Sequence, residues 1–180
     1  MEGLTVFTEM LAAEVLKTTP TKNKAALREA KRGILDYLAS ALAGREDAGV
    51  LKLLHAIEAE GGHPVAALIG QNKRANRRQA ALVNGFMGHA LDHDDVHSDV
   101  RGHPSSVILP ALFALAAGRG ISGKQFLDAY IIGVEVMARL GQAFGTVPYT
   151  HLRAHETSLH LVCRLLLEKK KFVISAFCMP

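Results

Sequence analysis

Residues 84–116 read NGFMGHALDHDDVHSDVRGHPSSVILPALFALA, and this stretch decides the fold because it joins two helical segments through a polar loop. Apolar residues recur at helical spacing before His89 and again after Pro104. The loop between them is dense in titratable side chains, which are costly unless they are solvated, paired, or held for proton transfer or metal binding. These side chains are His89, Asp92, His93, Asp94, Asp95, His97, Asp99 and His103. The chemistry of the chain is therefore expected in this loop.

Outside this stretch the apolar residues again recur at helical spacing, and no segment shows the sustained alternation of a strand. The sequence predicts an all-α fold, a multi-helix bundle, with one short extended segment at 65–69. Local capping signals place the helix starts at Thr21, Asp47, Asn76, Pro104 and the capping box of Ser122 with Gln125. The side chains predicted to be largely buried are Leu35, Leu38, Leu82, Phe86, Leu109, Leu112, Ile131 and Val134.

The composition predicts a globular protein with no membrane and no nucleic-acid partner. The 180 residues are 49% apolar, which suffices for a core. No apolar run reaches membrane-spanning length, and the acidic N-terminus does not read as a secretory signal, so a cytoplasmic location is expected. The net charge of +4 lies mostly in residues 148–180, and the remainder is close to neutral.

The last part of the chain has a different character. The strings YTHLRAHET (149–157) and HLVCRLLLEKKK (160–171) resemble the translation of a DNA adapter used to prepare sequencing libraries. They occur in the same order as in the adapter, and the gap between them has the size of the adapter's short variable index. Both cysteines, Cys163 and Cys178, lie in this part. The sequence therefore predicts a helical domain at 1–147, cut short, and a non-native tail at 148–180. A natural amphipathic helix over 155–171 is the alternative.

The residues of the loop leave more than one function open. Histidines 89, 93 and 97, spaced four apart with aspartates between them, suit a metal-dependent hydrolase with a two-metal site. Residues four apart, however, do not stay on one face of a helix over several turns. In addition, residues 1–147 contain no second cluster of metal-ligand residues. A non-catalytic helical interaction module is a third hypothesis, and its sign would be a broad exposed apolar face.

Residues 84–116 also resemble the signature region of the MmgE/PrpD family, which includes 2-methylcitrate dehydratases and cis-aconitate decarboxylases. The resemblance extends to RGILDYLASALAG (32–44), EGGHPVAALIG (60–70) and SGKQFLDAYIIGVEVMARLG (122–141). It implies a helical first domain, followed in the family by a smaller α/β domain, and a homodimer. It also implies a lyase without metal or cofactor that acts on small di- or tricarboxylates, most like 2-methylcitrate dehydratase. The 180-residue chain by itself is expected to be inactive.

The resemblance carries two catalytic residues onto this chain. Asp92 matches the first carboxylate of the family's D-x-D-D segment, and His103 matches the histidine of its H-P-S segment. Val96 stands where several members have threonine after D-x-D-D, which weakens a specific assignment to cis-aconitate. Elimination of water needs a base and an acid, and imidazole serves either role near neutral pH.

The remaining polar residues receive supporting roles. Ser105 and Ser106 begin the helix after Pro104, where backbone N–H groups favour the carboxylate of a substrate, and Arg101 adds complementary charge. His89 is interpreted as a packing histidine. The others are expected at the rim of the site, as helix caps or as ion-pair partners: His93, His97, Asp94 and Asp95.

Overall fold

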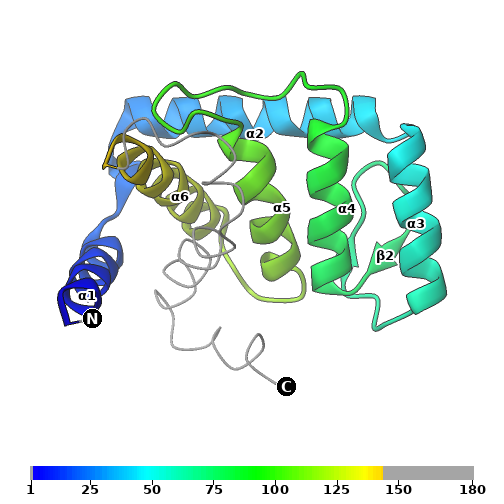
Figure 1. Ribbon diagram of the computed structural model, residues 1–180, viewed down its shortest axis with the longest axis horizontal. Coiled ribbons are helices and arrows are strands. Elements are labelled where there is room, and N and C mark those ends of the chain that lie inside the picture. The colour runs from blue at the N-terminus through cyan, green and yellow to red at the C-terminus, as the bar shows by residue number, and fades with distance from the viewer. Residues whose placement is uncertain (1, 144–180) are drawn as a thin grey trace.

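A computed structural model describes residues 2–143 of the chain, and this part is helical (Figure 1). The predicted all-α class is confirmed for these residues. The helices are α1 (Glu2–Lys17), the short 3₁₀ helix η1 (Pro20–Lys22), α2 (Lys24–Gly44), α3 (Ala48–Glu60), α4 (Arg77–His89), α5 (Pro104–Ala116) and α6 (Gly123–Ala143). The predicted tail at 148–180 lies outside the described residues.

Most helix starts follow from local side-chain chemistry. Asp47 accepts a hydrogen bond from the Gly49 N–H at the start of α3, and Asn76 forms a reciprocal capping box with Gln79 at the start of α4. The Ser122 and Gln125 capping box is confirmed at the start of α6. These bonds satisfy backbone donors that the first helical turn leaves unpaired.

The predicted helix start at Thr21 is wrong. Asn23 caps α2, with its side-chain oxygen accepting from the N–H groups of Ala25 and Ala26. Thr21 lies in η1 instead, and its N–H donates to Asp128 Oδ1 on α6 at 3.0 Å. The proline at the start of η1 fixes a tight turn, which delays α2 until after Lys22.

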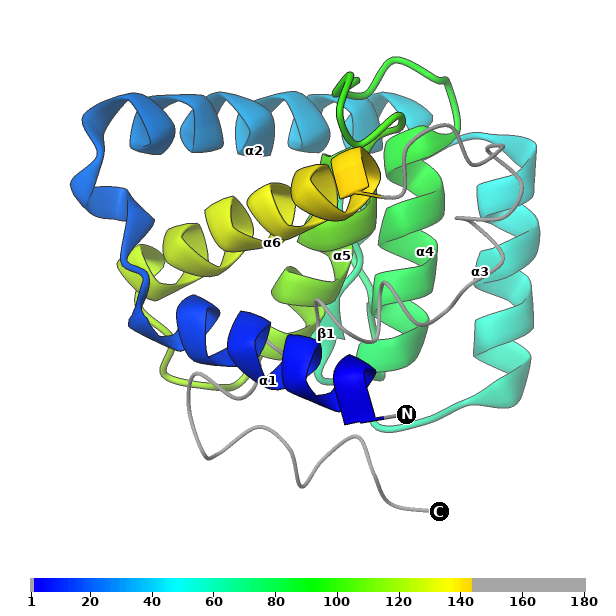
Figure 2. The ribbon, with the colours of Figure 1, turned by 60° about the vertical axis from the view of Figure 1, so that its left-hand side comes forward.

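The main core lies between α2 and the antiparallel pair α4 and α5 (Figure 1). Tyr37 of α2 is fully buried there and donates its hydroxyl to the carbonyl oxygen of Asn84. A Cβ at Gly88 would lie 2.6 Å from Tyr37 Cε2, so only glycine lets α4 approach α2 this closely. Figure 2 shows α1 beside α6, where Val15, Ile132 and Val136 form a second, smaller cluster.

A two-stranded antiparallel sheet joins α3 to α4. Its strands are β1 (Ala66–Ala67) and β2 (Arg74–Ala75), so the predicted extended segment at 65–69 is confirmed in part, whereas β2 was not predicted. The buried side chain of Asn84 holds this sheet against α4. It donates to the Ala67 carbonyl at 3.0 Å and accepts from the Ile69 N–H at 2.9 Å.

The core prediction is correct for α5 and wrong for parts of α2 and α4. Leu109 and Leu112 are buried, and Leu38, Ile131 and Val134 are partly buried. Three predicted core residues are exposed, because other faces of α2 and α4 contact the core through Tyr37, Ala41, Val83 and Met87. The exposed residues are Leu35, Leu82 and Phe86, at 70%, 56% and 43% of their surface.

Candidate active site

The loop 90–103 connects α4 to α5 and carries the polar cluster. It turns sharply after α4 because Asp92 adopts φ 53°, a left-handed conformation that aspartate tolerates better than most residues. The Asp92 N–H donates to the His89 carbonyl at 3.1 Å, which closes this turn. Farther along, the N–H of His97 donates to the Gly102 carbonyl at 3.0 Å, and Arg101 takes the second positive φ, 54°. The loop is therefore a defined structure that returns the chain to the start of α5.

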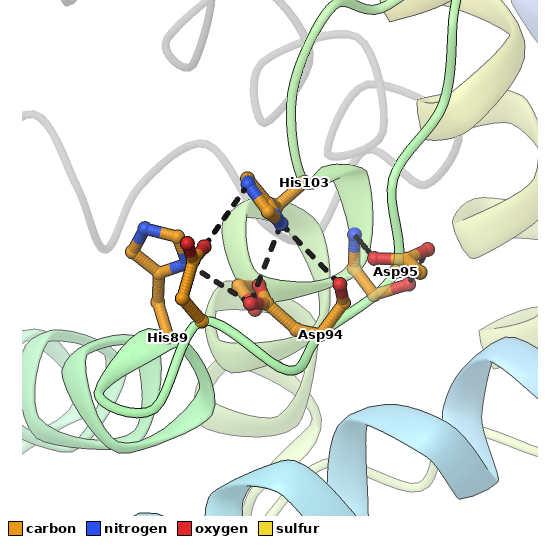
Figure 3. A network of polar contacts seen from close by, with 7 residues as sticks. His89, Asp94, Asp95 and His103 are labelled. Atoms are coloured by element: carbon orange, nitrogen blue, oxygen red, sulfur yellow. Dashed lines mark hydrogen bonds and ion pairs between the residues drawn. The ribbon is translucent and has the colours of Figure 1, made fainter.

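His103 lies at the centre of the cluster (Figure 3). Its Nε2 is 3.6 Å from Asp92 Oδ1, and its Nδ1 is 3.3 Å from Asp94 Oδ1. The rings of His89 and His103 are tilted against each other with centroids 4.5 Å apart. The His103 side chain is 14% exposed, whereas that of Asp92 is 77% exposed. His103 thus has a buried carboxylate on one side and a solvent-facing carboxylate on the other.

Asp94 is the buried partner that both histidines share. Its side chain has no exposed surface. Oδ1 lies 2.9 Å from His89 Nδ1, and Oδ2 accepts a hydrogen bond from the Ser106 hydroxyl. Burial by itself would raise the pKa of Asp94, but the hydrogen bonds from Ser106 and His89 and the charge of His103 outweigh it and lower the pKa. Asp94 is therefore ionised near neutral pH.

Asp95 points away from the imidazoles and belongs to a separate network (Figure 3). Its carboxylate accepts from the N–H and the hydroxyl of Ser105, and the Ser105 hydroxyl also contacts the hydroxyl of Tyr130 on α6. Burial raises the pKa of Asp95 despite the hydrogen bonds from Ser105. Burial also raises the pKa of Tyr130 to about 12. Asp95 thus caps α5 from the loop and fixes the backbone at Ser105, two residues after His103.

Several predicted site residues come together, and others do not. Asp92 and His103 lie within 3.6 Å, as expected for residues of one site. The hydroxyls of Ser105 and Ser106 are engaged by Asp95 and Asp94 inside the protein, and Arg101 is exposed at the turn. The catalytic roles of Asp92 and His103 stay predictions. So do the substrate-binding roles of Arg101, Ser105 and Ser106.

His89 was interpreted as a satisfied packing histidine, and its ring does have a partner and packs against that of His103. Its side chain is partly exposed and contacts Asp94 in the same group as His103. His93 is exposed, and the half-buried His97 accepts the Asp99 N–H at its Nδ1, so both lie apart from that group. The position of His89 at the last turn of α4, directly before the loop, was the signal in the sequence that connects it to His103.

Four side chains of the cluster could also hold a metal ion. One ligand atom from each of His89, Asp92, Asp94 and His103 lies within 4.8 Å of the others. This set differs from the histidines 89, 93 and 97 of the hydrolase hypothesis. Both Nδ1 atoms, however, lie within 3.3 Å of Asp94 Oδ1. A nitrogen that donates a hydrogen bond there has no lone pair for an ion, so a metal ion would have to be held by the Nε2 atoms of the two rings.

Comparison with known proteins places these features in a family. The model of the MmgE/PrpD N-terminal domain matches residues 9–163. The chain is 35% identical to the cis-aconitate decarboxylase-like protein oryM of Aspergillus oryzae over 124 residues, which are 65% of this chain and 26% of that protein. It is 32% identical to the cis-aconitate decarboxylase of Aspergillus terreus over 65% of this chain and 25% of the relative.

The human cis-aconitate decarboxylase is 42% identical over 65 residues, which are 34% of this chain and 13% of the relative. In the two fungal relatives the matched segment spans about a quarter of the protein. The range matched by the family model includes residues 148–163, where the sequence predicted a non-native tail. These residues lie outside the described structure, and the assignment of the tail stays a prediction.

Proposed function

The chain belongs to the MmgE/PrpD family, and from this premise we propose that its protein is a lyase acting on a small di- or tricarboxylate. The observation that carries the proposal is the position of His103 between the buried carboxylate of Asp94 and the exposed carboxylate of Asp92. Imidazole is a common proton donor and acceptor in general acid–base catalysis. The reaction class therefore involves proton transfer beside a substrate carboxylate.

His103 would work through its Nε2, the ring nitrogen that is nearer to the exposed Asp92. The Asp94 carboxylate approaches Nδ1, orients the ring, and stabilises the imidazolium that forms when Nε2 takes a proton. Asp92 lies 3.6 Å from Nε2 on the solvent side, where it would hold the ring or exchange a proton with the substrate. In dehydration, the base removes a proton from the carbon next to a carboxylate, and an acid protonates the hydroxyl that leaves as water.

Dehydration of a hydroxytricarboxylate such as 2-methylcitrate is the specific reaction that we propose. Val96 supports it, because this exposed apolar side chain supplies no hydroxyl where several family members have threonine. Decarboxylation of cis-aconitate is the second candidate, and the names of the relatives favour it. There the electron pair left by the departing CO₂ would be delocalised over the neighbouring double bond and take up a proton, and a protonated His103 would supply that proton.

For substrate binding we propose that Arg101 contacts a carboxylate directly, since its side chain is exposed beside the loop. Ser105 and Ser106 would act by holding Asp95 and Asp94, because their hydroxyls are already engaged there. The start of α5 would add backbone N–H groups and a favourable dipole. A homodimer, a cytoplasmic location and the absence of metal and cofactor remain predictions. Among the described helices, none has the length and apolarity to cross a membrane.

The test is an assay of a protein of the relatives' length that contains residues 1–147 of this chain. Turnover of 2-methylcitrate and of cis-aconitate would be followed by chromatography of the products. We expect His103→Gln to lower kcat by about 10²–10⁴-fold while KM changes little. The exposed His93 provides the matched control, and His93→Gln should keep kcat within about twofold. Equal activity of the two variants would refute the role of His103.

A further inference from the structure

Two arginines lie close together at the end of the α4 and α5 pair that is far from His103. Arg77 begins α4, and Arg119 follows the end of α5. Because the two helices run antiparallel, their other ends meet here, opposite the loop 90–103 (Figure 1). Thirteen residues at about 1.5 Å each make a helix of about 20 Å, so this place is separate from the candidate active site.

Neither arginine has its hydrogen-bonding capacity satisfied. Arg77 Nη2 donates to the Ala117 carbonyl at 2.9 Å, but Arg77 Nε is buried without a partner. Arg119 Nη1 is likewise buried without a partner. None of the ion pairs formed within residues 2–143 includes either side chain. A buried, unpaired donor on a charged group is costly, and native proteins rarely leave one without a ligand, ion or water.

The two charges also repel each other. Burial lowers the pKa of Arg119, and the charge of Arg77 lowers it further, so the two guanidinium groups are near enough to interact. Arginine stays protonated in proteins, and the repulsion is therefore not relieved by losing a proton. The partial negative charge at the end of α5 meets Arg77 through the Ala117 carbonyl. It offsets a fraction of one charge and leaves the rest of the pair uncompensated.

We propose that Arg77 and Arg119 form a binding site for a small oxyanion, a phosphate or a carboxylate group, which accepts hydrogen bonds from the unpartnered guanidinium donors. Guanidinium groups match the oxygens of such anions in geometry and charge, and the interaction is strong where the site is partly buried. Gly118 turns the chain between the two arginines at φ 70°, and a Cβ there would be in ordinary contact with Arg77 Nη2 at 3.9 Å, which places the guanidinium of Arg77 beside the segment that carries Arg119. The site is independent of the proposed lyase reaction.

Inorganic phosphate is the probe for this proposal. Thermal unfolding of the 180-residue chain would be measured with increasing phosphate, and chloride would hold the ionic strength constant. We expect a saturable rise in Tm, and Arg119→Gln should weaken phosphate binding about tenfold or more. The control is Arg28→Gln, which removes one positive charge from an exposed arginine that pairs with Glu29. In chloride alone, Arg119→Gln should be at least as stable as the unaltered chain, because it removes the repulsion.

Three outcomes would overturn the proposal. Equal phosphate effects in the Arg119→Gln and Arg28→Gln chains would show a general salt effect. Loss of the effect in His103→Gln, with retention in Arg119→Gln, would place phosphate at the other end of the helix pair. Self-association of the chain that Arg119→Gln abolishes, without any phosphate effect, would assign the pair to a carboxylate of a second copy.

A measurement on the unaltered chain avoids any dependence on the folding of a variant. In nitrogen-15 NMR spectra, the Arg77 Nε–H signal should shift saturably with phosphate. Acetate at the same ionic strength would test whether a carboxylate is bound as well. An Arg77 signal that does not respond to either anion would refute the site.

Discussion

The two ends of the α4 and α5 pair differ in whether their charged side chains have partners inside the protein. At the end that carries the loop 90–103, the buried carboxylate of Asp94 lies between two imidazoles and the Ser106 hydroxyl. At the other end, the charges of Arg77 and Arg119 interact, and neither side chain is in an ion pair formed among the described residues. A self-compensated cluster is suited to moving protons, whereas an uncompensated pair is suited to binding a charged ligand.

The largest loss of stability is expected for substitution of Asp94, because the two histidines of the cluster share this one buried carboxylate. Asp94→Asn keeps the shape of the side chain but removes the charge that His89 and His103 share, and it should lower the free energy of unfolding by about 2–3 kcal/mol. Asp92→Asn is the matched control, because it makes the same chemical change on the exposed carboxylate of the cluster. It should cost less than about 0.5 kcal/mol. Urea unfolding of both chains gives the comparison, and similar losses would show that Asp94 is not the central group.

A smaller effect tests how the helices hold the cluster in place. Gly88→Ala would bring a Cβ to 2.6 Å from Tyr37 Cε2, and the overpacking should cost about 1–2 kcal/mol after the gain in helix propensity. The control is Gly120→Ala near the arginine end, where a Cβ meets nothing within 4 Å. Its expected change is within about 0.5 kcal/mol. Equal stability of the two variants in urea unfolding would mean that α2 and α4 can separate without cost.

The sequence predicted the helices well because their signals are local. Asp47, Asn76 and Ser122 each cap a helix through a bond to a residue two or three positions along the chain. The buried face of α2 was harder to predict, because apolar residues such as Leu35 occupy more than one face of that helix. The choice between faces is made by the contact of Tyr37 with Gly88, and single-sequence periodicity does not contain that contact.

The sequence also predicted only a part of the candidate site. The proximity of Asp92 and His103 followed from the family resemblance, whereas the central position of Asp94 did not. Asp94 and Asp95 are neighbours of the same type, and the left-handed turn at Asp92 contributes to which carboxylate meets the imidazoles. The arginine pair was not predicted at all, because Arg77 and Arg119 are distant in sequence and belong to no motif.

The pH dependence of the two neighbouring aspartates should separate them further. The lowered pKa of Asp94 means that its contribution to stability is complete above 3.8, its ordinary pKa, and is lost as the pH falls through its lower value in the fold. The raised pKa of Asp95 has the opposite sign, since ionisation above 3.8 favours the unfolded chain. Each contribution should amount to about 1 kcal/mol or less.

Carbon-13 NMR titration of the two carboxyl groups tests this prediction directly. The Asp94 carboxyl should titrate below 3.8, and the Asp95 carboxyl should titrate above it. In urea unfolding at acidic pH, Asp94→Asn should flatten the loss of stability, whereas Asp95→Asn should steepen it. Identical titration of the two carboxyl groups would contradict the assignment of one to the imidazoles and the other to the cap of α5.

The smallest expected effect is that of metal removal, and it tests whether the His103 end balances its charge without an ion. His89 and His103 both direct Nδ1 to the same oxygen of Asp94, which favours shared protons over metal ligation at those atoms. We expect purified chain to contain well under one equivalent of transition metal, and chelator treatment to leave its Tm unchanged. Elemental analysis and thermal unfolding measure these quantities. The matched variants are His89→Ala, which removes a candidate ligand, and His93→Ala, which removes an exposed histidine outside the group. One equivalent of zinc that His89→Ala abolishes and His93→Ala retains would make the cluster a metal centre, and the contrast between the two ends would then be one of occupied and unoccupied ion sites.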